Sequence, residues 1–277
     1  MGTPAIGPER NEASRPRLRI LHNMARSGGT LISRCVACME GVALLSEIHP
    51  LGTEIFNPLT QAMSWFGVPQ PRDVLALREA GPVGFEDAIL LIHARARERG
   101  LELVLRDWSH LDFLGMPLVA DPPYRSLLAE VLGSHFELVR MATVRHPFDQ
   151  WLSSATFPSI RDHLSPEAFM AGCRKFAEMA RAIGFVRFED FCEDPAAAMQ
   201  RICNGLDLPL DPAFAEKQAD WTRITGDSPA YGRGDGAIRR LGRRPFDPRL
   251  LERIEAIPDY HATLKLLGYA PVVATPV

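Results

Sequence analysis

The chain has 277 residues, 46% hydrophobic and 23% charged, which is typical of a soluble globular protein long enough to bury a full α/β core. The formal net charge of −3 gives no reason to expect a nucleic-acid partner. No run of about 18 apolar residues occurs, so we expect no transmembrane helix. Residues 1–16 lack the apolar core of a signal peptide, and we expect a cytoplasmic protein.

Cysteine usage fits the same compartment. The five cysteines are odd in number and lie within apolar or helical patterns: Cys35, Cys38, Cys173, Cys192 and Cys203. A reduced environment suits them better than a disulfide framework. Cys35 and Cys38 would share the helix face that packs on a sheet, and no second pair exists to complete a zinc site. We expect buried thiols.

Strand and helix patterns alternate along the chain. Five segments are predicted to be strands: 17–23, 41–47, 101–107, 136–144 and 185–188. Helices are expected after residue 30, through most of 57–100, and at 124–132, 147–155, 165–183, 195–206 and 248–257. This alternation predicts a parallel, doubly wound α/β sheet of about five strands flanked by helices. We expect one domain over residues 17–270, between a disordered tail at 1–16 and a short tail at 271–277.

The first strand leads into a glycine turn that opens a helix. Gly28 and Gly29 permit backbone dihedrals and close approaches that other residues do not. Thr30 begins the helix, whose first N–H groups and dipole attract phosphate or sulfate. Arg26 adds a forked cation suited to an oxyanion. The turn is therefore predicted to bind an anion.

Other polar residues follow the remaining strands, where ligands of such sheets gather. The segment after the fourth predicted strand carries Arg145, Asp149 and Ser153. Arg145 and Ser153 lie on one side, two helical turns apart, and could clamp a second phosphate. Alternatively, Arg145 pairs with Asp149 and Ser153 has no role.

Two other readings of the glycine turn are weaker. An ATP-binding P-loop requires a lysine directly after its last glycine, and no lysine in this chain follows a glycine. Ser27 in a strand-to-helix turn resembles a degenerate nucleophile elbow of a serine hydrolase. That fold places several strands before its nucleophile, whereas only one precedes Ser27. A non-catalytic nucleotide-binding protein is a further alternative.

The motifs together resemble the sulfotransferases that use 3′-phosphoadenosine 5′-phosphosulfate (PAPS). Their phosphosulfate loop, commonly P-R-S-G-T-T-L, is similar to residues 25–31, ARSGGTL. Their R-x-x-x-D-x-x-x-S motif matches the spacing at residues 145–153, and the segment FVRFEDFCEDP at 185–195 resembles a third family segment. The departures are Ala25 for the usual proline and Gly29 for the usual first threonine.

The resemblance implies transfer of a sulfuryl group from PAPS to a hydroxyl or amine, without a metal. The P-loop-like segment would hold the 5′-phosphosulfate through Arg26, Ser27, Gly28, Gly29, Thr30 and Leu31. Arg145 and Ser153 would bind the 3′-phosphate. Arg233, Arg239 and Arg240, in a Gly- and Arg-rich segment, could close over the nucleotide.

A general base must take the acceptor proton. Glu47, at the end of the second predicted strand, is the first candidate by the same resemblance. His49 and His110 are alternatives, and Arg106 could be the cation near the transferred group or could pair with Asp107. Positioning without a base is also open. The acceptor class (small molecule, lipid, glycan or peptide) and the oligomeric state do not follow from these motifs.

Overall fold

The computed structural model describes residues 15–226 and 237–273 and contains a five-stranded parallel sheet in the order β2-β3-β1-β4-β5. The strands are β1 (Arg17–Asn23), β2 (Val42–Ile48), β3 (Glu102–Asp107), β4 (Glu137–Val144) and β5 (Phe185–Arg187). β1 lies at the centre, with Leu21 opposite Arg106 of β3 and Asn23 opposite Thr143 of β4. The predicted α/β class is confirmed.

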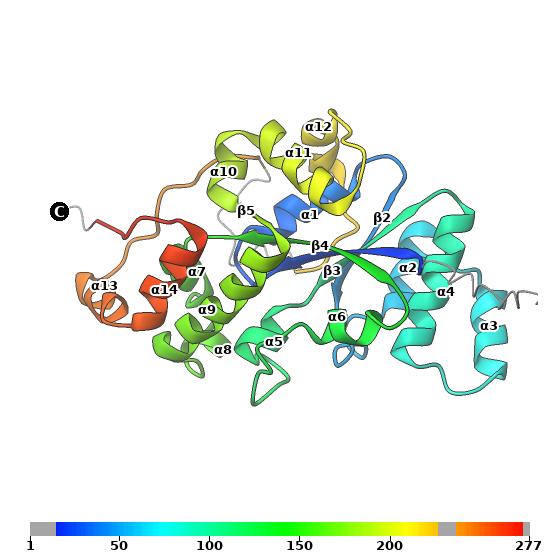
Figure 1. The fold of residues 1–277 in the computed structure, drawn as a ribbon, viewed down its shortest axis with the longest axis horizontal. Helices are drawn as coiled ribbons and strands as arrows, with labels where there is room; N and C mark the ends of the chain where they lie inside the picture. The colour runs from blue at the N-terminus through cyan, green and yellow to red at the C-terminus, as the bar shows by residue number, and fades with distance from the viewer. Residues whose placement is uncertain (1–14, 227–236, 274–277) are drawn as a thin grey trace, which may run out of the picture.

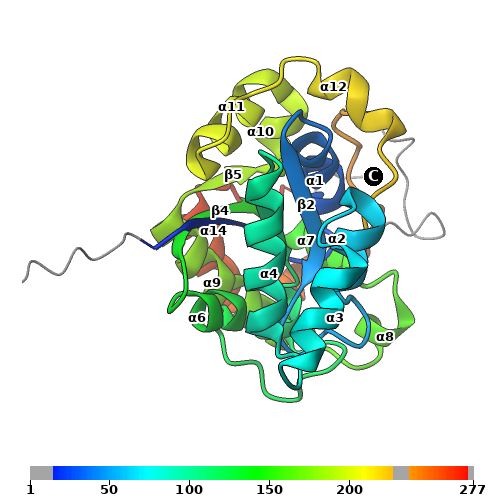
Figure 2. The same ribbon diagram turned by 90° about the vertical axis from the view of Figure 1, so that its right-hand side faces the viewer.

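Helices cover both faces of the sheet, as Figure 1 shows. One face carries α1 (Gly29–Ala37), α10 (Phe188–Glu193), α11 (Pro195–Leu206), α12 (Phe214–Lys217) and the short 3-10 turn η1 (Gln218–Asp220). The opposite side carries α2 (Pro58–Phe66), α3 (Pro71–Glu79), α4 (Phe85–Glu98), α5 (His110–Leu114), α6 (Leu127–Leu132), α7 (Pro147–Ser154), α8 (Pro158–Arg161), α9 (Pro166–Ile183), α13 (Pro248–Glu255) and α14 (Pro258–Leu267). Figure 2 shows α2, α3 and α4 together beside β2.

Three apolar clusters hold these layers together. One joins α1 and α11 to β1 through residues such as Leu21 and Ile202. A second packs α4 and α6 on the other face, around Ile20 and Ile92. The third joins α9 to α7, α13 and α14. β2 is buried along its whole length, which fits the continuous apolar run of its residues 42–45; Ser46 and Glu47 follow as buried polar residues.

Several predicted boundaries are corrected by the structure. The fifth strand ends at Arg187, because Phe188 already begins α10. The stretch after β3, expected to be a loop, contains α5 (His110–Leu114). The helix expected from residue 124 begins only at Leu127, because Ser126 is its N-cap. The Ser126 side chain accepts a hydrogen bond from the Ala129 amide. Short helices were missed because they span too few residues to show a period.

The prediction that Cys35 and Cys38 are buried thiols on the sheet-facing side of a helix is confirmed. All five thiols are free, and Cys35 and Cys38 lie buried on the sheet-facing side of α1. Burial raises the pKa of Cys38 to about 11, so the thiol stays protonated at neutral pH. Among the helices of residues 15–226 and 237–273, none has the length and apolar character needed to cross a membrane.

Candidate active site

A cavity of about 1260 Å³ opens at the carboxyl edge of the sheet. The ends of β1, β2 and β3 contribute Asn23, Glu47 and Arg106 to its wall. Arg145, the residue just after β4, lines it as well. A pocket for one drug-sized ligand measures about 300–1000 Å³, so this cavity has room for two ligands side by side.

The loop between β1 and α1 forms one wall of the cavity. Gly28 precedes α1 with a left-handed φ of 83°, and a Cβ there would lie 2.1 Å from the ring of Phe188. A Cβ on Gly29 would lie 2.3 Å from the side-chain nitrogen of Asn23. Both positions therefore require glycine. The first N–H groups of α1 have no carbonyl four residues earlier in the helix, and this cradle places them at the cavity.

Helix α7 holds this loop in place. Gln150 donates from Nε2 to the carbonyl oxygen of Ala25 at 2.7 Å, and Arg145 donates from Nη1 to the carbonyl of Arg26 at 3.0 Å. Arg26 in turn donates from Nε to Ser153 Oγ at 3.1 Å. The two motifs singled out in the sequence are thus joined directly, although 119 residues separate Arg26 from Arg145.

Positive charge is concentrated on the cavity. Arg26, Arg34, Arg106 and Arg145 line it from the sheet edge and from α1. Arg239, Arg240, Arg243 and Arg244 line it from the segment before α13, whereas Arg233 lies outside the described residues. Three carboxylates share the described lining, namely Glu47, Asp149 and Glu189, and Arg243 donates to Asp149 at 2.7 and 3.0 Å. In a chain of net charge −3, such an excess of cations marks a site for a polyanion.

Ser27 is placed differently from its loop neighbours. Its hydroxyl is 1% exposed and donates to the carbonyl of Met24 at 2.7 Å. The side chain therefore stabilises the turn from behind, whereas Gly28, Gly29, Thr30 and Leu31 line the cavity. A buried hydroxyl bound to a main-chain carbonyl lacks the exposure that a hydrolase nucleophile needs.

Glu47 reaches the cavity through an irregularity in β2. The pairing of β2 with β3 shifts register between Leu45 and Ile48, and Glu47 there has a left-handed φ of 56°. β2 is not a neighbour of β1, because β3 lies between them, so adjacency of these two strands does not bring Glu47 to the glycine turn. The bulge aims the Glu47 side chain into the cavity instead, 7% exposed and packed against Gly226.

Arg106 is held beside Glu47 by several acceptors. It donates from Nε to Asn23 Oδ1 at 3.1 Å and from Nη1 to Ser46 Oγ and the carbonyl of Thr225, both at 3.0 Å. Its Nη2 lies 3.8 Å from Glu47 Oε1, and the guanidinium is 4% exposed. A buried cation fixed in this way stabilises negative charge that develops nearby.

His110 also lines the cavity, but its ring is engaged. Trp108 donates from Nε1 to His110 Nε2 at 2.8 Å. Indole nitrogen is a donor only, so Nε2 must be the acceptor and the proton of the neutral ring is on Nδ1. Burial lowers the pKa of His110 to about 4, against a smaller raising effect of Glu47. The ring is thus neutral at pH 7. Its one lone pair that could take a proton, on Nε2, already accepts the hydrogen bond from Trp108.

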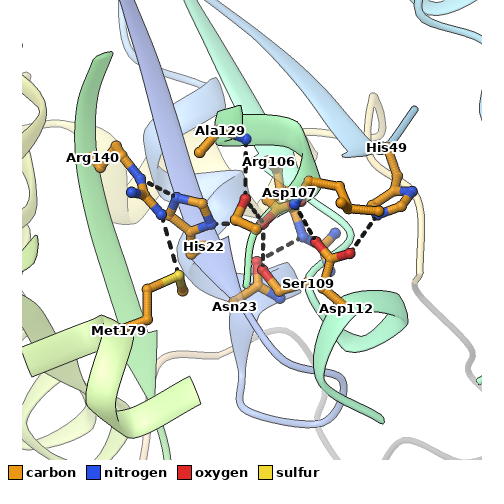
Figure 3. A network of polar contacts seen from close by, with 12 residues as sticks. His22, Asn23, His49, Arg106, Asp107, Ser109, Asp112, Ala129, Arg140 and Met179 are labelled. Carbon is orange, nitrogen blue, oxygen red and sulfur yellow. Dashed lines mark hydrogen bonds and ion pairs between the residues drawn. The ribbon is translucent and has the colours of Figure 1, made fainter. Parts of the chain in front are cut away.

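His49 does not reach the cavity. Its ring is fully buried and lies 3.1 Å from Asp112 Oδ1, in the polar network of Figure 3. Burial raises the pKa of Asp112. His49 anchors α5 beneath the cavity and is not in a position to meet a substrate there.

The same figure shows a second buried pair, His22 with Asp107. His22 Nδ1 lies 2.6 Å from Asp107 Oδ2, which also accepts from Ser109 Oγ at 2.8 Å, and Arg140 donates to His22 Nε2 at 3.0 Å. Burial raises the pKa of Asp107, but the hydrogen bonds from His22 and Ser109 and the electrostatic attraction of His22 and His49 together outweigh burial and lower this pKa below its ordinary value. Asp107 therefore braces the turn that carries Trp108.

Among the cavity residues that sequence reasoning missed are Asn23, Trp108 and Phe188. Asn23 is the last residue of β1, and Trp108 and Phe188 directly follow β3 and β5, so the rule that ligands gather at strand ends was sufficient to find all three. The two aromatic residues were missed because an aromatic residue in a sequence is read first as core. Within the described ranges, no three His, Cys, Asp or Glu side chains are grouped as metal ligands would be.

Two solved structures share this fold over nearly their whole length. The sulfotransferase domain of the Synechococcus PCC 7002 olefin synthase is 16% identical, with a TM-score of 0.59, covering 95% of this chain and 98% of its own. A sulfotransferase domain from the curacin biosynthetic pathway is 13% identical, with a TM-score of 0.62, covering 93% and 99% respectively. No family model and no curated protein matches the sequence. The chain therefore has the fold of sulfotransferase domains, as the motifs indicated.

Proposed function

We propose that this protein is a PAPS-dependent sulfotransferase. The observation that carries the proposal is the meeting, in one cavity, of the glycine anion loop, the Arg145/Ser153 motif and a buried carboxylate–arginine pair. The sulfotransferase fold of the chain supports the same conclusion. An anion loop alone would serve a binding protein, whereas Glu47 beside Arg106 supplies groups that a transfer reaction uses.

The residues present fit the nucleotide. Because Gly28 has no side chain, the loop packs against Phe188 with its backbone turned to the cavity, and the N-terminus of α1 supplies N–H donors for the 5′-phosphosulfate. Arg26 would neutralise that group. Arg145 and Ser153, which the structure places beside Arg26, would hold the 3′-phosphate. Arg239 and Arg240 line the same cavity and would contact the nucleotide from the opposite segment.

In the overall reaction the sulfuryl group passes from PAPS to the acceptor oxygen or nitrogen, and the bisphosphate nucleotide leaves. Glu47 takes the proton from the hydroxyl or amine of the acceptor molecule, since its carboxylate faces the cavity. His110 is not available for this, because its free lone pair accepts the hydrogen bond from Trp108. Arg106 and Arg26 stabilise negative charge on either side of the transferred group.

Calorimetric titration with 3′-phosphoadenosine 5′-phosphate tests the cofactor directly. We expect it to bind, with AMP at least about tenfold weaker, because the loss of one charge-assisted contact corresponds to about 1.5–3 kcal/mol. ATP and NAD serve as controls. Equal affinity for AMP and the bisphosphate would remove the Arg145/Ser153 site and overturn the proposal.

A further inference from the structure

The two halves of the cavity differ in chemistry. The half beside β1, β4 and α1 carries Arg26, Arg34 and Arg145, to which the segment before α13 adds four further arginines. The half at the ends of β2 and β3 is lined by Phe56, Trp108, Met116 and Pro117 from the loops after these strands. A polyanion and an apolar molecule would therefore bind at opposite ends of the cavity.

Trp108 is the centre of the apolar half. Its ring meets Phe56 edge-to-face at 4.8 Å between centroids, and its Nε1 is bonded to His110. Gly52 packs so closely on the ring that a Cβ there would lie 2.8 Å away. The indole is 5% exposed and cannot swing aside, so it presents a rigid apolar surface beside Glu47.

Polar groups in this half are few and already engaged. Glu47 and Arg106 are each less than a tenth exposed, and His110 uses its acceptor on Trp108. A sugar would bring several hydroxyls to this wall and leave most of them without partners, which is costly. An alcohol on an apolar body would place a single hydroxyl at Glu47 and bury the remainder.

The apolar character continues outward along the same loops. Leu51 and Ile55 flank Gly52 and Phe56, and their side chains are 57% and 52% exposed. Leu118 follows Met116 and Pro117 and is 48% exposed. These exposed side chains belong to the same loops as the apolar lining, so an apolar ligand longer than the cavity would find further apolar contacts along these loops.

We propose that the acceptor is an alcohol with an apolar body, bound against Trp108 as the specificity-determining residue with its hydroxyl at Glu47. This inference rests on the proposed function, since it assigns the half of the cavity that the nucleotide leaves open. Phenols and long-chain aliphatic alcohols share this chemistry, and the probes below separate them.

The test is a calorimetric titration of the full chain, with and without saturating 3′-phosphoadenosine 5′-phosphate. The probes are 2-naphthol, 1-octanol and methyl β-galactoside. We expect at least one of the first two to bind about 100-fold more tightly than the galactoside, since burying roughly three or four methylene groups corresponds to that ratio. Tighter binding of naphthol indicates a flat aromatic acceptor, and tighter binding of octanol a chain.

Variants locate the site. Trp108→Ala should weaken the apolar probe by about tenfold or more, and Met116→Lys should do so by placing a charge on the wall without emptying it. Leu75→Lys, on an exposed position of α3 that does not line the cavity, is the matched control. Unchanged nucleotide affinity shows that each variant is folded.

Absence of binding by both apolar alcohols, or tighter binding of the galactoside, overturns this inference. So does unchanged probe affinity in both Trp108→Ala and Met116→Lys. If the nucleotide binds while the alcohols do not, the proposed function stands and only the acceptor class is wrong. If the nucleotide fails to bind, the proposed function fails, and the titrations without nucleotide still decide whether the apolar half binds an alcohol.

Discussion

Two side chains of one cavity illustrate how neighbours select among candidate bases. Glu47 and His110 both face the cavity, and either residue type can take a proton from an alcohol. The indole of Trp108 occupies Nε2 of His110, whereas the Glu47 carboxylate faces Arg106 and the open cavity. The difference lies in hydrogen-bond partners rather than in residue type.

At this scale we expect Glu47→Gln to lower turnover by about 10²–10⁴, the usual contribution of a positioned general base, because glutamine keeps the size but removes the basicity. Nucleotide affinity should hardly change. The measurement is sulfuryl transfer from PAPS to the best-binding alcohol, together with the calorimetric Kd. His110→Gln and His49→Ala are the comparison variants. If Glu47→Gln retains wild-type turnover while a histidine variant loses it, the base is that histidine.

Elements are positioned here by close backbone approaches. The turn into α1 fits against Phe188 of α10 because Gly28 has no side chain, and its carbonyls are held by Gln150 of α7 and by Arg145 just before that helix. The anion loop is thus built by three elements, of which only one contains its sequence motif. A substitution in the loop should act on binding as well as on stability.

Gly28→Ala tests this, with Gly41→Ala as its control. Both glycines have positive φ (83° and 74°), but a Cβ on Gly41 would meet only a carbonyl oxygen at 3.9 Å. We expect Gly41→Ala to cost roughly 1 kcal/mol of unfolding free energy and to leave nucleotide affinity unchanged. Gly28→Ala should in addition weaken the nucleotide by about tenfold or more, since it displaces charge-assisted hydrogen bonds. Equal nucleotide affinity in the two variants would show that the loop is not the anion site.

For the whole molecule, burial of titratable groups near the cavity makes stability depend on pH. The pKa of His110 is about 4 in the folded protein, against about 6.5 in an unfolded chain. Between these values the unfolded state binds more protons, so the free energy of unfolding falls as pH falls. The contribution of His110 is fully present above pH 6.5 and lost towards pH 4.

Urea denaturation at several pH values between 7.5 and 4 measures this effect. We expect wild type to lose up to about 3 kcal/mol more than His110→Gln over the interval, since glutamine accepts from Trp108 but does not titrate. Parallel loss in both proteins would show that His110 contributes nothing, and that other groups, such as His146, whose pKa burial also lowers, determine the acid sensitivity.

The sequence by itself determined the α/β class, the five strands to within a residue or two, and the glycine turn that opens α1. These follow from local causes: apolar runs, glycine dihedrals and helix starts depend on residues close together in the chain. It also indicated that Arg145 and Ser153 belong with the loop, by spacing and resemblance. The structure places them in direct contact with Arg26.

Only the tertiary structure decided which candidate base is available and what surrounds it. The order β2-β3-β1, the bulge at Glu47, the bond from Trp108 to His110 and the burial of His49 all depend on contacts between distant segments. The apolar half of the cavity likewise comes from loops that no local pattern relates. Side-chain direction at a bulge and the partner of a buried histidine are set by packing, which a linear pattern does not contain.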